Sequence, residues 1–263
     1  TSLAELAADW ARVDRDFGWQ TGVRILRQPV VENLLTFIAS SNNNIKRITM
    51  LVDRLCERYG ESVATAKGRF YAVPSVAAIA KDPEIEATFR GLGFGYRAAY
   101  YAKSVQMLCA EHPDPDAFLD GLRALPADRA RAELLRLSGV GPKVADCVCL
   151  MSLDNPATVP IDTHMWQVAQ RRYVPRILDG SLPDVPSAAV ALARQLRSAR
   201  APTSATYEAA QQLFVHLFGP YSGWAQGLLF SGDLAPMQKS KQPASPDPTQ
   251  SPPKRRRRQA NKT

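Results

Sequence analysis

A lysine and an aspartate are the residues of this sequence whose types and spacing best suit chemistry. Lys143 closes the glycine-containing turn "LSGVGPK" (137–143), and Asp162 follows an extended Pro-Ile dipeptide. An amine and a carboxylate held together suit attack at a sugar C1′ carbon. The amine adds to form an imine, and the carboxylate stabilises the oxocarbenium charge that develops.

Each of the two residues also has a plain structural interpretation. Pro142 suits the first position of a helix, so Lys143 is predicted in the first helical turn, an unfavourable place for a spectator cation. Asp162 precedes a helical pattern and is a natural N-cap, which contributes about 1 kcal/mol. The combination, more than either residue alone, favours chemistry.

The turn before Lys143 is a second candidate feature. Gly139 and Gly141 allow a tight turn with outward-pointing amides, and amides at the start of a helix bind anions. A phosphate could therefore dock there without side-chain charge. This matters because the formal net charge of +8 is concentrated in residues 238–263, which hold eight basic residues against one acidic residue.

The elements that must position these residues are predicted to be helical. Apolar residues recur at three- and four-residue spacing in 3–17 and almost continuously from Val31 onward. "GVRIL" (22–26) is predicted as a short strand for which no later segment clearly supplies a partner. The predicted helices from Val31 onward cover 45–59, 96–109, 116–125, 127–137, 143–153, 163–172, 187–198, 206–218 and 222–230.

Composition narrows the class of protein. The four cysteines form no C-x-x-C pair, which predicts reduced, buried thiols and neither a metal site nor an iron–sulfur cluster. No apolar run reaches the length of a membrane span, so no membrane partner is expected. Residues 238–263 have almost no apolar side chains and are predicted to be disordered. Their "PPKRRRR" (252–258) indicates a nuclear localisation signal or a nonspecific nucleic-acid arm, and we favour nuclear localisation.

The stretch from Leu137 to Tyr173 resembles the helix-hairpin-helix DNA glycosylases, in particular their 8-oxoguanine branch. The likeness extends over 3–234, and "SSNNN" and "GWAQ" point to that branch. The other motifs that carry it, in the same order as in the family, are "GVRILRQP" (22–29), "SSNNNIKRIT" (40–49), "LGFGYRAAY" (92–100) and "FGPYSGWAQGLLFSGDL" (218–234).

The resemblance implies a mainly α fold with a two-lobed helical helix-hairpin-helix core over residues 31–237. Residues 1–30 would be the remnant of an N-terminal β-containing domain, of which the last helix and strand survive here. That domain helps relatives to distinguish 8-oxoguanine from guanine. The segment "VPRILDGSLPDVPSAAV" (174–190) departs from the family and is expected to be a variable surface loop.

The resemblance also implies roles for the chemical residues and the base pocket. Lys143 would be the Schiff-base nucleophile and Asp162 the catalytic carboxylate. Four further residues would surround an extruded base: two stack on its faces, one lines the pocket, and one hydrogen-bonds its Watson–Crick edge. Cys147 and Phe230 would stack on the two faces, Met151 would line the pocket, and Gln226 would bond to the edge.

A third set of residues would contact DNA around the lesion. His164 would bind a phosphate, Tyr96 would wedge into the vacated stack, and the Gly139–Gly141 turn would bind the backbone. The cytosine left behind would be held by Asn42, Arg47 and Arg97. Taken singly, each of these is an ordinary core, loop or surface residue, and their joint occurrence favours the functional interpretation.

The predicted function is therefore that of a bifunctional DNA glycosylase and AP lyase. It would act on double-stranded DNA containing oxidised guanine opposite cytosine, as a monomer and with no cofactor. Two alternatives stay open: a helix-hairpin-helix glycosylase for another damaged base, and a noncatalytic DNA-binding module.

Overall fold

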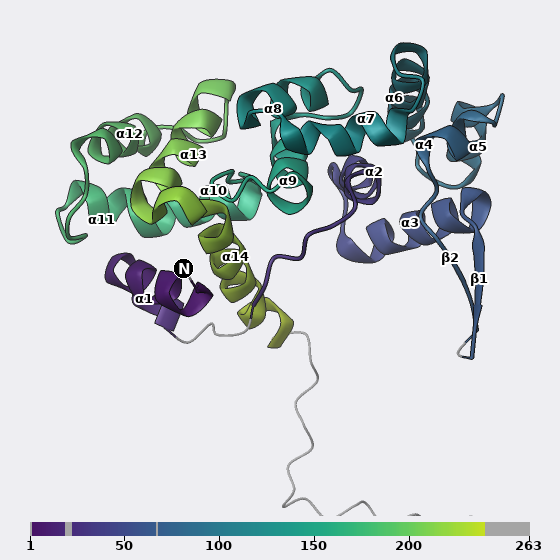
Figure 1. The fold of residues 1–263 in the computed structure, drawn as a ribbon. Coiled ribbons are helices and arrows are strands. Elements are labelled where there is room, and N and C mark those ends of the chain that lie inside the picture. The colour runs from purple at the N-terminus through teal and green to yellow at the C-terminus, as the bar shows by residue number, and fades with distance from the viewer. Residues whose placement is uncertain (1, 19–22, 67, 240–263) are drawn as a thin grey trace, which may run out of the picture.

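The computed structural model describes residues 2–18, 23–66 and 68–239. Within them the fold is almost entirely helical, as predicted, and it divides into two lobes (Figure 1). One hydrophobic core is built from buried residues between Val30 and Leu153. A second core joins Leu6, Trp10 and Phe17 near the N-terminus to buried residues between Val159 and Leu229. The chain therefore begins in the second lobe, crosses to the first and returns.

The first lobe holds the predicted turn and lysine. Its helices are α2 (Val30–Ser40), α3 (Ile45–Tyr59), α4 (Val76–Ala80), α5 (Ile85–Gly91), α6 (Arg97–Glu111), α7 (Pro115–Gly121), α8 (Ala127–Leu135) and α9 (Pro142–Ser152), with a 3₁₀ turn at Leu122–Ala124. Local signals set several of these ends. The Asn44 side chain accepts a hydrogen bond from Arg47 N and begins α3, and Gly60 ends it.

The helices of the second lobe carry the predicted carboxylate and the later pocket residues. They are α1 (Leu3–Val13), α10 (Thr163–Val168), α11 (Val174–Leu178), α12 (Ser187–Arg197), α13 (Ser204–Phe218) and α14 (Ser222–Lys239). A π-helical turn (Ala169–Tyr173) joins α10 to α11, and 3₁₀ turns lie at Arg15–Gly18 and Gly219–Tyr221. Helix α14 extends nine residues past its predicted end at Phe230.

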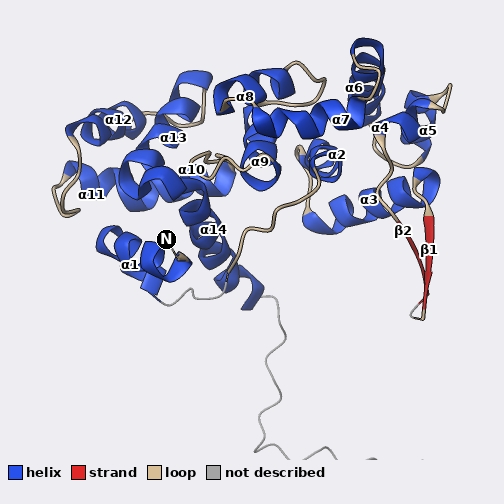
Figure 2. Cartoon of the chain, viewed as in Figure 1, coloured by secondary structure: helices blue, strands red, loops and turns tan. Residues whose placement is uncertain are grey.

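The predicted strand at 22–26 is wrong for the residues that the structure describes. Residues 23–29 form a loop between the lobes (Figure 2), and Gly22 lies outside the described part. No strand pairs with this segment within the described ranges. It is anchored instead by the Gln28 amide, which donates to Met151 O at 2.8 Å, and by an ion pair between Arg27 and Asp154.

A β-hairpin that the sequence pattern did not predict projects from the first lobe (Figure 2). Strands β1 (Ser62–Thr65) and β2 (Gly68–Tyr71) pair antiparallel, with Ser62 opposite Tyr71. Both strands are exposed along their whole length, so their sequence lacks the alternation of apolar and polar residues by which half-buried strands are found.

The predicted surface loop at 174–190 is also only partly correct. Its first residues form α11, and Val174, Ile177 and Leu182 are buried in the second core. Pro175 lies in the first turn of that short helix, a position that proline tolerates. The predicted disordered tail falls on residues outside the described part, except Gln238 and Lys239, which end α14. Among described residues, no helix is both long and apolar enough to span a bilayer.

Candidate active site

The glycine turn joins α8 to α9 as predicted. Gly139 has φ +81°, a conformation that L-residues with side chains rarely adopt, and a Cβ added there would lie 2.7 Å from Tyr100 side-chain atoms. Gly141 is the N-cap of α9 at φ −90°, and Pro142 occupies the first helical position. The turn thus requires glycine at Gly139 for two reasons, close approach and backbone conformation.

Lys143 lies half-buried in the first turn of α9. Its Nζ atom is 4.3 Å from the ring centroid of Phe37 on α2, a cation–π distance that fixes the amine against the first lobe. The side chain is therefore held by the protein rather than extended into solvent.

Asp162 caps α10, as predicted. Its Oδ1 atom accepts a hydrogen bond from Met165 N at 2.8 Å, and its side chain is half-buried. The cap fixes the carboxylate at the junction between the extended segment 159–161 and the helix, because only an N-cap conformation lets the side chain reach the first-turn amides.

The charges of both predicted catalytic residues act on Cys147, which lies one turn after Lys143 on α9. Burial raises the pKa of its thiol to about 12; the charge of Lys143 and a hydrogen bond with it lower that pKa, and the charge of Asp162 raises it. Lys143 and Asp162 both act on this one thiol although they belong to different lobes.

The residues predicted to complete the base pocket lie on α9 and α14. Gln226 is 8% exposed, and Phe230 follows one turn later on α14. The Phe230 ring meets the His164 ring edge-to-face, with centroids 5.8 Å apart, so the predicted phosphate ligand and stacking residue are neighbours. Met151 is half-buried near the end of α9, and its carbonyl holds the loop between the lobes.

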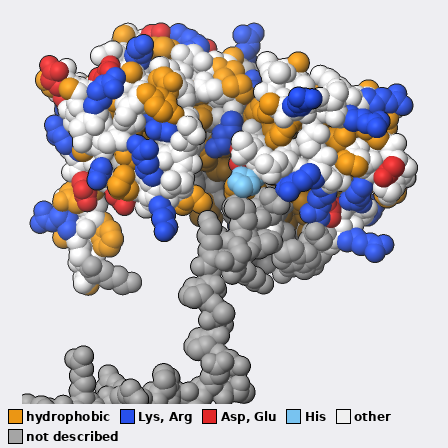
Figure 3. Space-filling model, turned by 180° about the vertical axis from the view of Figure 1, so that it is seen from behind, with side chains coloured by type: hydrophobic (Ala, Val, Ile, Leu, Met, Phe, Trp, Pro, Cys, Tyr) orange, Lys and Arg blue, Asp and Glu red, His pale blue; other side chains and the backbone are white. Residues whose placement is uncertain are grey.

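The predicted wedge residue and the glycine turn share one hollow. Tyr96 is 49% exposed, and a pocket of about 300 Å³ is lined by the α2–α3 connection, α6 and the turn, namely by Ser41, Tyr96, Tyr100, Gly139, Val140 and Gly141. An exposed aromatic ring beside outward-facing amides suits a surface that contacts both bases and phosphates. Seen from behind, the molecule is hollowed between the lobes, with Lys and Arg side chains on both sides (Figure 3).

Arg97 differs from the other predicted DNA contacts because it is 2% exposed. Its guanidinium donates to the Ser41 carbonyl and, at 3.1 Å, to the Asn42 carbonyl, and it stacks on the Tyr96 ring at 4.4 Å. Asn42 itself is exposed, with φ +46°. In this structure Arg97 braces the turn that presents Asn42, and its contact with a cytosine stays a prediction.

Arg47, the third residue predicted to hold the cytosine, is exposed on α3. Its Nη2 atom donates to Gly93 O at 3.2 Å. Asn42, Arg47, Tyr96 and Arg97 therefore lie around the α2–α3 connection and the start of α6, as one group in the first lobe. Their roles toward DNA also stay predictions.

The sequence reasoning missed one buried group next to the site. Asp146, between Lys143 and Cys147 in the sequence, is fully buried and accepts hydrogen bonds from Arg131, Tyr207 and Gln211. A signal was present, since an aspartate within the apolar face of "PKVADCVCLMS" needs buried partners. Those partners are 15 to 65 positions away along the chain, so local patterns could not identify them.

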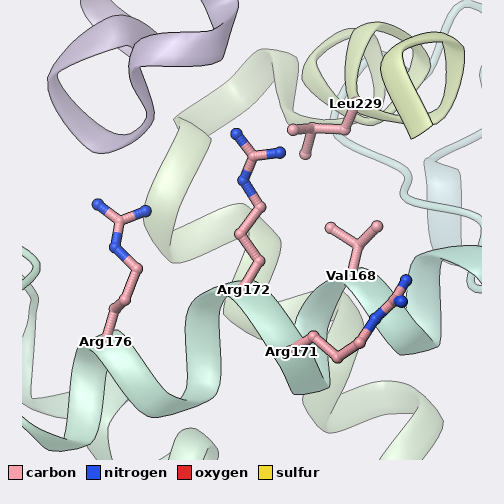
Figure 4. Close-up of a pocket in the computed structure, with 5 residues that line it drawn as sticks. All are labelled: Val168, Arg171, Arg172, Arg176 and Leu229. Atoms are coloured by element: carbon pink, nitrogen blue, oxygen red, sulfur yellow. The ribbon is translucent and has the colours of Figure 1, made fainter. Parts of the chain in front are cut away.

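A larger pocket, of about 420 Å³, is lined by none of the predicted site residues (Figure 4). It is lined by Val168, Arg171, Arg172, Arg176 and Leu229. Arg172 pairs with the buried Asp14, and Arg176 donates to Val13 O at 3.1 Å. Two of the three arginines thus hold the N-terminal segment against the second lobe. These contacts explain why the pocket is rich in arginine.

Metal ligation has no candidate among the residues that the structure describes, where no group of three or more His, Cys, Asp or Glu side chains is placed to hold an ion. The four cysteines form no disulfide; Cys56, Cys147 and Cys149 are buried and Cys109 is half-buried.

The chain is similar to known proteins in sequence and in fold. Residues 35–177 match the family model described as "HhH-GPD superfamily base excision DNA repair protein", a range that includes the glycine turn, Lys143 and Asp162. The chain is 39% identical over 244 residues to "N-glycosylase/DNA lyase OGG1" of Arabidopsis thaliana, which covers 91% of the chain and 60% of that relative. It is 34% identical over 233 residues to "N-glycosylase/DNA lyase" of Saccharomyces cerevisiae, covering 86% and 61%.

A solved structure shows the same fold. The Clostridium acetobutylicum 8-oxoguanine glycosylase/lyase, in complex with double-stranded DNA containing cytosine opposite 8-oxoguanine, superposes with a TM-score of 0.68 at 26% identity. The match covers 91% of this chain and 71% of the other. The chain spans about three fifths of the length of the two curated relatives.

Proposed function

This chain belongs to the HhH-GPD superfamily of base excision DNA repair proteins, and we propose that it is a bifunctional DNA glycosylase and AP lyase that removes 8-oxoguanine opposite cytosine from duplex DNA. The observation that carries the proposal is that the half-buried Lys143 stands at the start of α9 directly after the glycine turn, while the Asp162 carboxylate is fixed as the N-cap of α10. The names of the curated relatives support the reaction class, and the DNA complex of the Clostridium acetobutylicum protein supports the substrate.

The proposed reaction begins at the sugar C1′ carbon. The nitrogen lone pair of Lys143 attacks C1′ as the bond from C1′ to the base nitrogen breaks, and the base leaves with the electron pair of that bond and a proton. The Asp162 carboxylate stabilises the positive charge that develops on the sugar. The Lys143 nitrogen supplies that proton to the base and gives its second proton to the ring oxygen as the sugar ring opens, which leaves an imine between Lys143 and C1′.

The imine then explains the lyase step. A proton leaves C2′, the electrons form a double bond between C2′ and C3′, and the bond from C3′ to the phosphate oxygen breaks. The strand is cut on the 3′ side of the lesion, and water releases Lys143 from the sugar. The same imine is reduced by borohydride to a stable amine, which makes the intermediate measurable.

Base recognition rests on α9 and α14. An extruded purine would lie between Cys147 and Phe230, with Gln226 at its hydrogen-bonding edge, and stacking with edge contacts offsets part of the cost of unstacking. Burial raises the pKa of Cys147 to about 12, so the thiol is neutral at physiological pH. A neutral thiol can face a purine ring without the desolvation cost that a thiolate would carry. The neutral form of Cys147 therefore suits stacking on the base.

The deciding experiment is borohydride trapping. The protein is incubated with a labelled duplex carrying 8-oxoguanine opposite cytosine, borohydride is added, and the covalent adduct is counted by electrophoresis. We expect an adduct with the unsubstituted protein and none with Lys143→Gln. A folded, DNA-binding protein that gives no adduct would contradict the lyase assignment.

Parallel duplexes separate the alternatives. Adducts on other damaged bases but not on 8-oxoguanine would favour a glycosylase of different specificity. DNA binding without an adduct on any lesion, or on an abasic site, would favour a noncatalytic binding module. Circular dichroism of each variant shows whether a loss of adduct reflects unfolding.

We further propose that the protein acts as a monomer in the nucleus. The support for nuclear import is the "PPKRRRR" run (252–258), which lies outside the described residues. A fluorescent fusion is expected to concentrate in nuclei, and replacing the four arginines 255–258 with alanine is expected to disperse it. Sedimentation with and without a duplex measures the oligomeric state.

A further inference from the structure

One buried carboxylate joins three helices beside the candidate active site. Asp146 on α9 is 0% exposed. Its Oδ1 atom accepts from Arg131 Nε of α8 at 2.6 Å, and its Oδ2 atom accepts from the Tyr207 hydroxyl at 2.6 Å and Gln211 Nε2 at 2.8 Å, both on α13. Because α9 belongs to the first core and Tyr207 to the second, these bonds cross between the lobes.

The two α13 side chains continue from Asp146 to the segment that leads to Asp162. Gln211 Nε2 also donates to Val159 O at 2.9 Å, and the Tyr207 oxygen accepts from Ile161 N at 3.2 Å. Ile161 is the residue immediately before Asp162. A continuous path of hydrogen bonds therefore runs from α9, the helix of Lys143, to the backbone beside the candidate carboxylate.

We propose that Asp146, Tyr207 and Gln211 are positioning residues for the proposed reaction, holding the 159–161 segment so that Asp162 faces the Lys143 end of α9. The inference rests on the proposed function, since it concerns the distance between the two catalytic residues assigned there. The proposal gives Asp146 and Tyr207 no contact with the sugar or the base.

The electrostatic surroundings of Asp146 and Tyr207 favour the hydrogen bonds that link α9 to α13. Burial raises the pKa of Asp146, and the hydrogen bonds from Arg131, Tyr207 and Gln211 lower it. Burial and the neighbouring carboxylate raise the pKa of the Tyr207 phenol well above its usual value, so this hydroxyl stays protonated and donates. Its oxygen lone pairs then remain available for the Ile161 amide.

A second trio of residues offers a matched control. The Tyr173 hydroxyl donates to Asp14 Oδ2 at 2.8 Å, and Arg172 pairs with the same carboxylate. Tyr173 and Asp14 are buried in the second lobe, as Tyr207 is. The chemistry is thus the same, a phenol and an arginine on a buried aspartate, but this trio leads to the N-terminal segment and not to Asp162.

The experiment compares Tyr207→Phe with Tyr173→Phe. For each folded variant we measure the Kd for an uncleavable duplex and the single-turnover rate of adduct formation under borohydride. We expect both variants to lose stability against urea and to bind DNA with unchanged Kd. Only Tyr207→Phe should slow adduct formation, by about 10-fold or more, because a displacement of about 1 Å in a catalytic group can cost 100-fold in rate.

A second variant keeps the proposal falsifiable if Tyr207→Phe fails to fold. Gln211→Met removes the tie to Val159 and preserves volume, and it is expected to slow the same step. Equal adduct rates in the unsubstituted protein and in the folded Tyr207→Phe or Gln211→Met variants would overturn the inference. An unsubstituted protein that forms no adduct would instead overturn the proposed function, so the two failures are distinguishable.

Discussion

The guanidinium of Arg97 donates a 3.1 Å hydrogen bond to the carbonyl of Asn42, and it does so from an almost completely buried position. The same group also binds the Ser41 carbonyl and stacks on Tyr96. A residue expected at the DNA surface is therefore part of the framework in this structure. Because Arg97 holds these backbone groups in place, we expect it to stabilise the protein in the absence of DNA.

Arg97→Met is expected to lower the free energy of unfolding by about 1–3 kcal/mol, because two partly buried carbonyls lose their donor. Urea denaturation of the free protein measures this. Arg47→Met on exposed α3 is the control and should change stability by no more than about 0.5 kcal/mol. Equal stability of the Arg97 variant and the unsubstituted protein would show that the buried guanidinium is not a brace.

The two glycines of the turn give a matched pair. Gly139→Ala is expected to cost about 1–3 kcal/mol and to weaken DNA binding, because φ is +81° and the new Cβ would lie 2.7 Å from Tyr100. Gly141→Ala should be tolerated, since its φ is −90° and an added Cβ meets no atom within 4 Å. Urea midpoints and duplex affinity are the measurements; similar losses in both variants would contradict the geometry.

The parts of this site that the sequence predicts are those determined by neighbouring residues in the chain. The start of α9 at Pro142 and the cap at Asp162 follow from residues next to them, so both were predicted correctly. The partners of Asp146 and the burial of Arg97 depend on contacts across 15 to 65 residues, and no periodicity reveals them.

The same reasoning explains the errors in the fold. The segment 22–26 has strand-forming residues, but strands need partners, and the described part of the chain pairs its strands elsewhere. The hairpin of β1 and β2 was missed because both of its strands are exposed. The likeness to a family, more than periodicity, pointed to the two lobes and the pairing of Lys143 with Asp162.

The N-terminal helix is expected to be an integral part of the second lobe. Trp10 is 3% exposed, packs against Phe17 and Phe218, and donates from Nε1 to Phe218 O at 3.0 Å. Trp10→Ala should therefore cost about 3–5 kcal/mol. Leu26→Ala, at a side chain that is 70% exposed, is the control with little expected effect. A small change in the urea midpoint for Trp10→Ala would mean that α1 packs only loosely.

Thiol burial predicts a pH dependence of stability. Burial raises the pKa of Cys149 to about 12, whereas an unfolded thiol ionises near about 8.5. Between these values the unfolded chain has lost a proton that the folded protein keeps, so the free energy of unfolding falls as pH rises, by at most about 1.4 kcal/mol per pH unit for this thiol.

Cys149→Ala tests this sign because Cys149 is outside the predicted base pocket. Urea unfolding at pH 8 and pH 10 should show a smaller fall in stability for the variant than for the unsubstituted protein. The variant also creates a small cavity, which lowers stability at both pH values and leaves the difference interpretable. An identical fall in both proteins would contradict the expected ionisation.

Base recognition and sugar chemistry should separate at Gln226. This side chain is 8% exposed on α14, one turn before Phe230, and the proposal places it at the edge of the extruded base. Gln226→Leu keeps a similar volume but removes the hydrogen-bonding amide, so excision of 8-oxoguanine should slow by about 10- to 100-fold, the effect of about 1–3 kcal/mol.

An abasic duplex has no base to recognise, and its adduct with borohydride should form at an unchanged rate. Lys143→Gln, in contrast, should lose both adducts, because one amine serves both substrates. If Gln226→Leu slows the abasic reaction as much as excision, then Gln226 contributes to the general architecture of the site and not to recognition of the base.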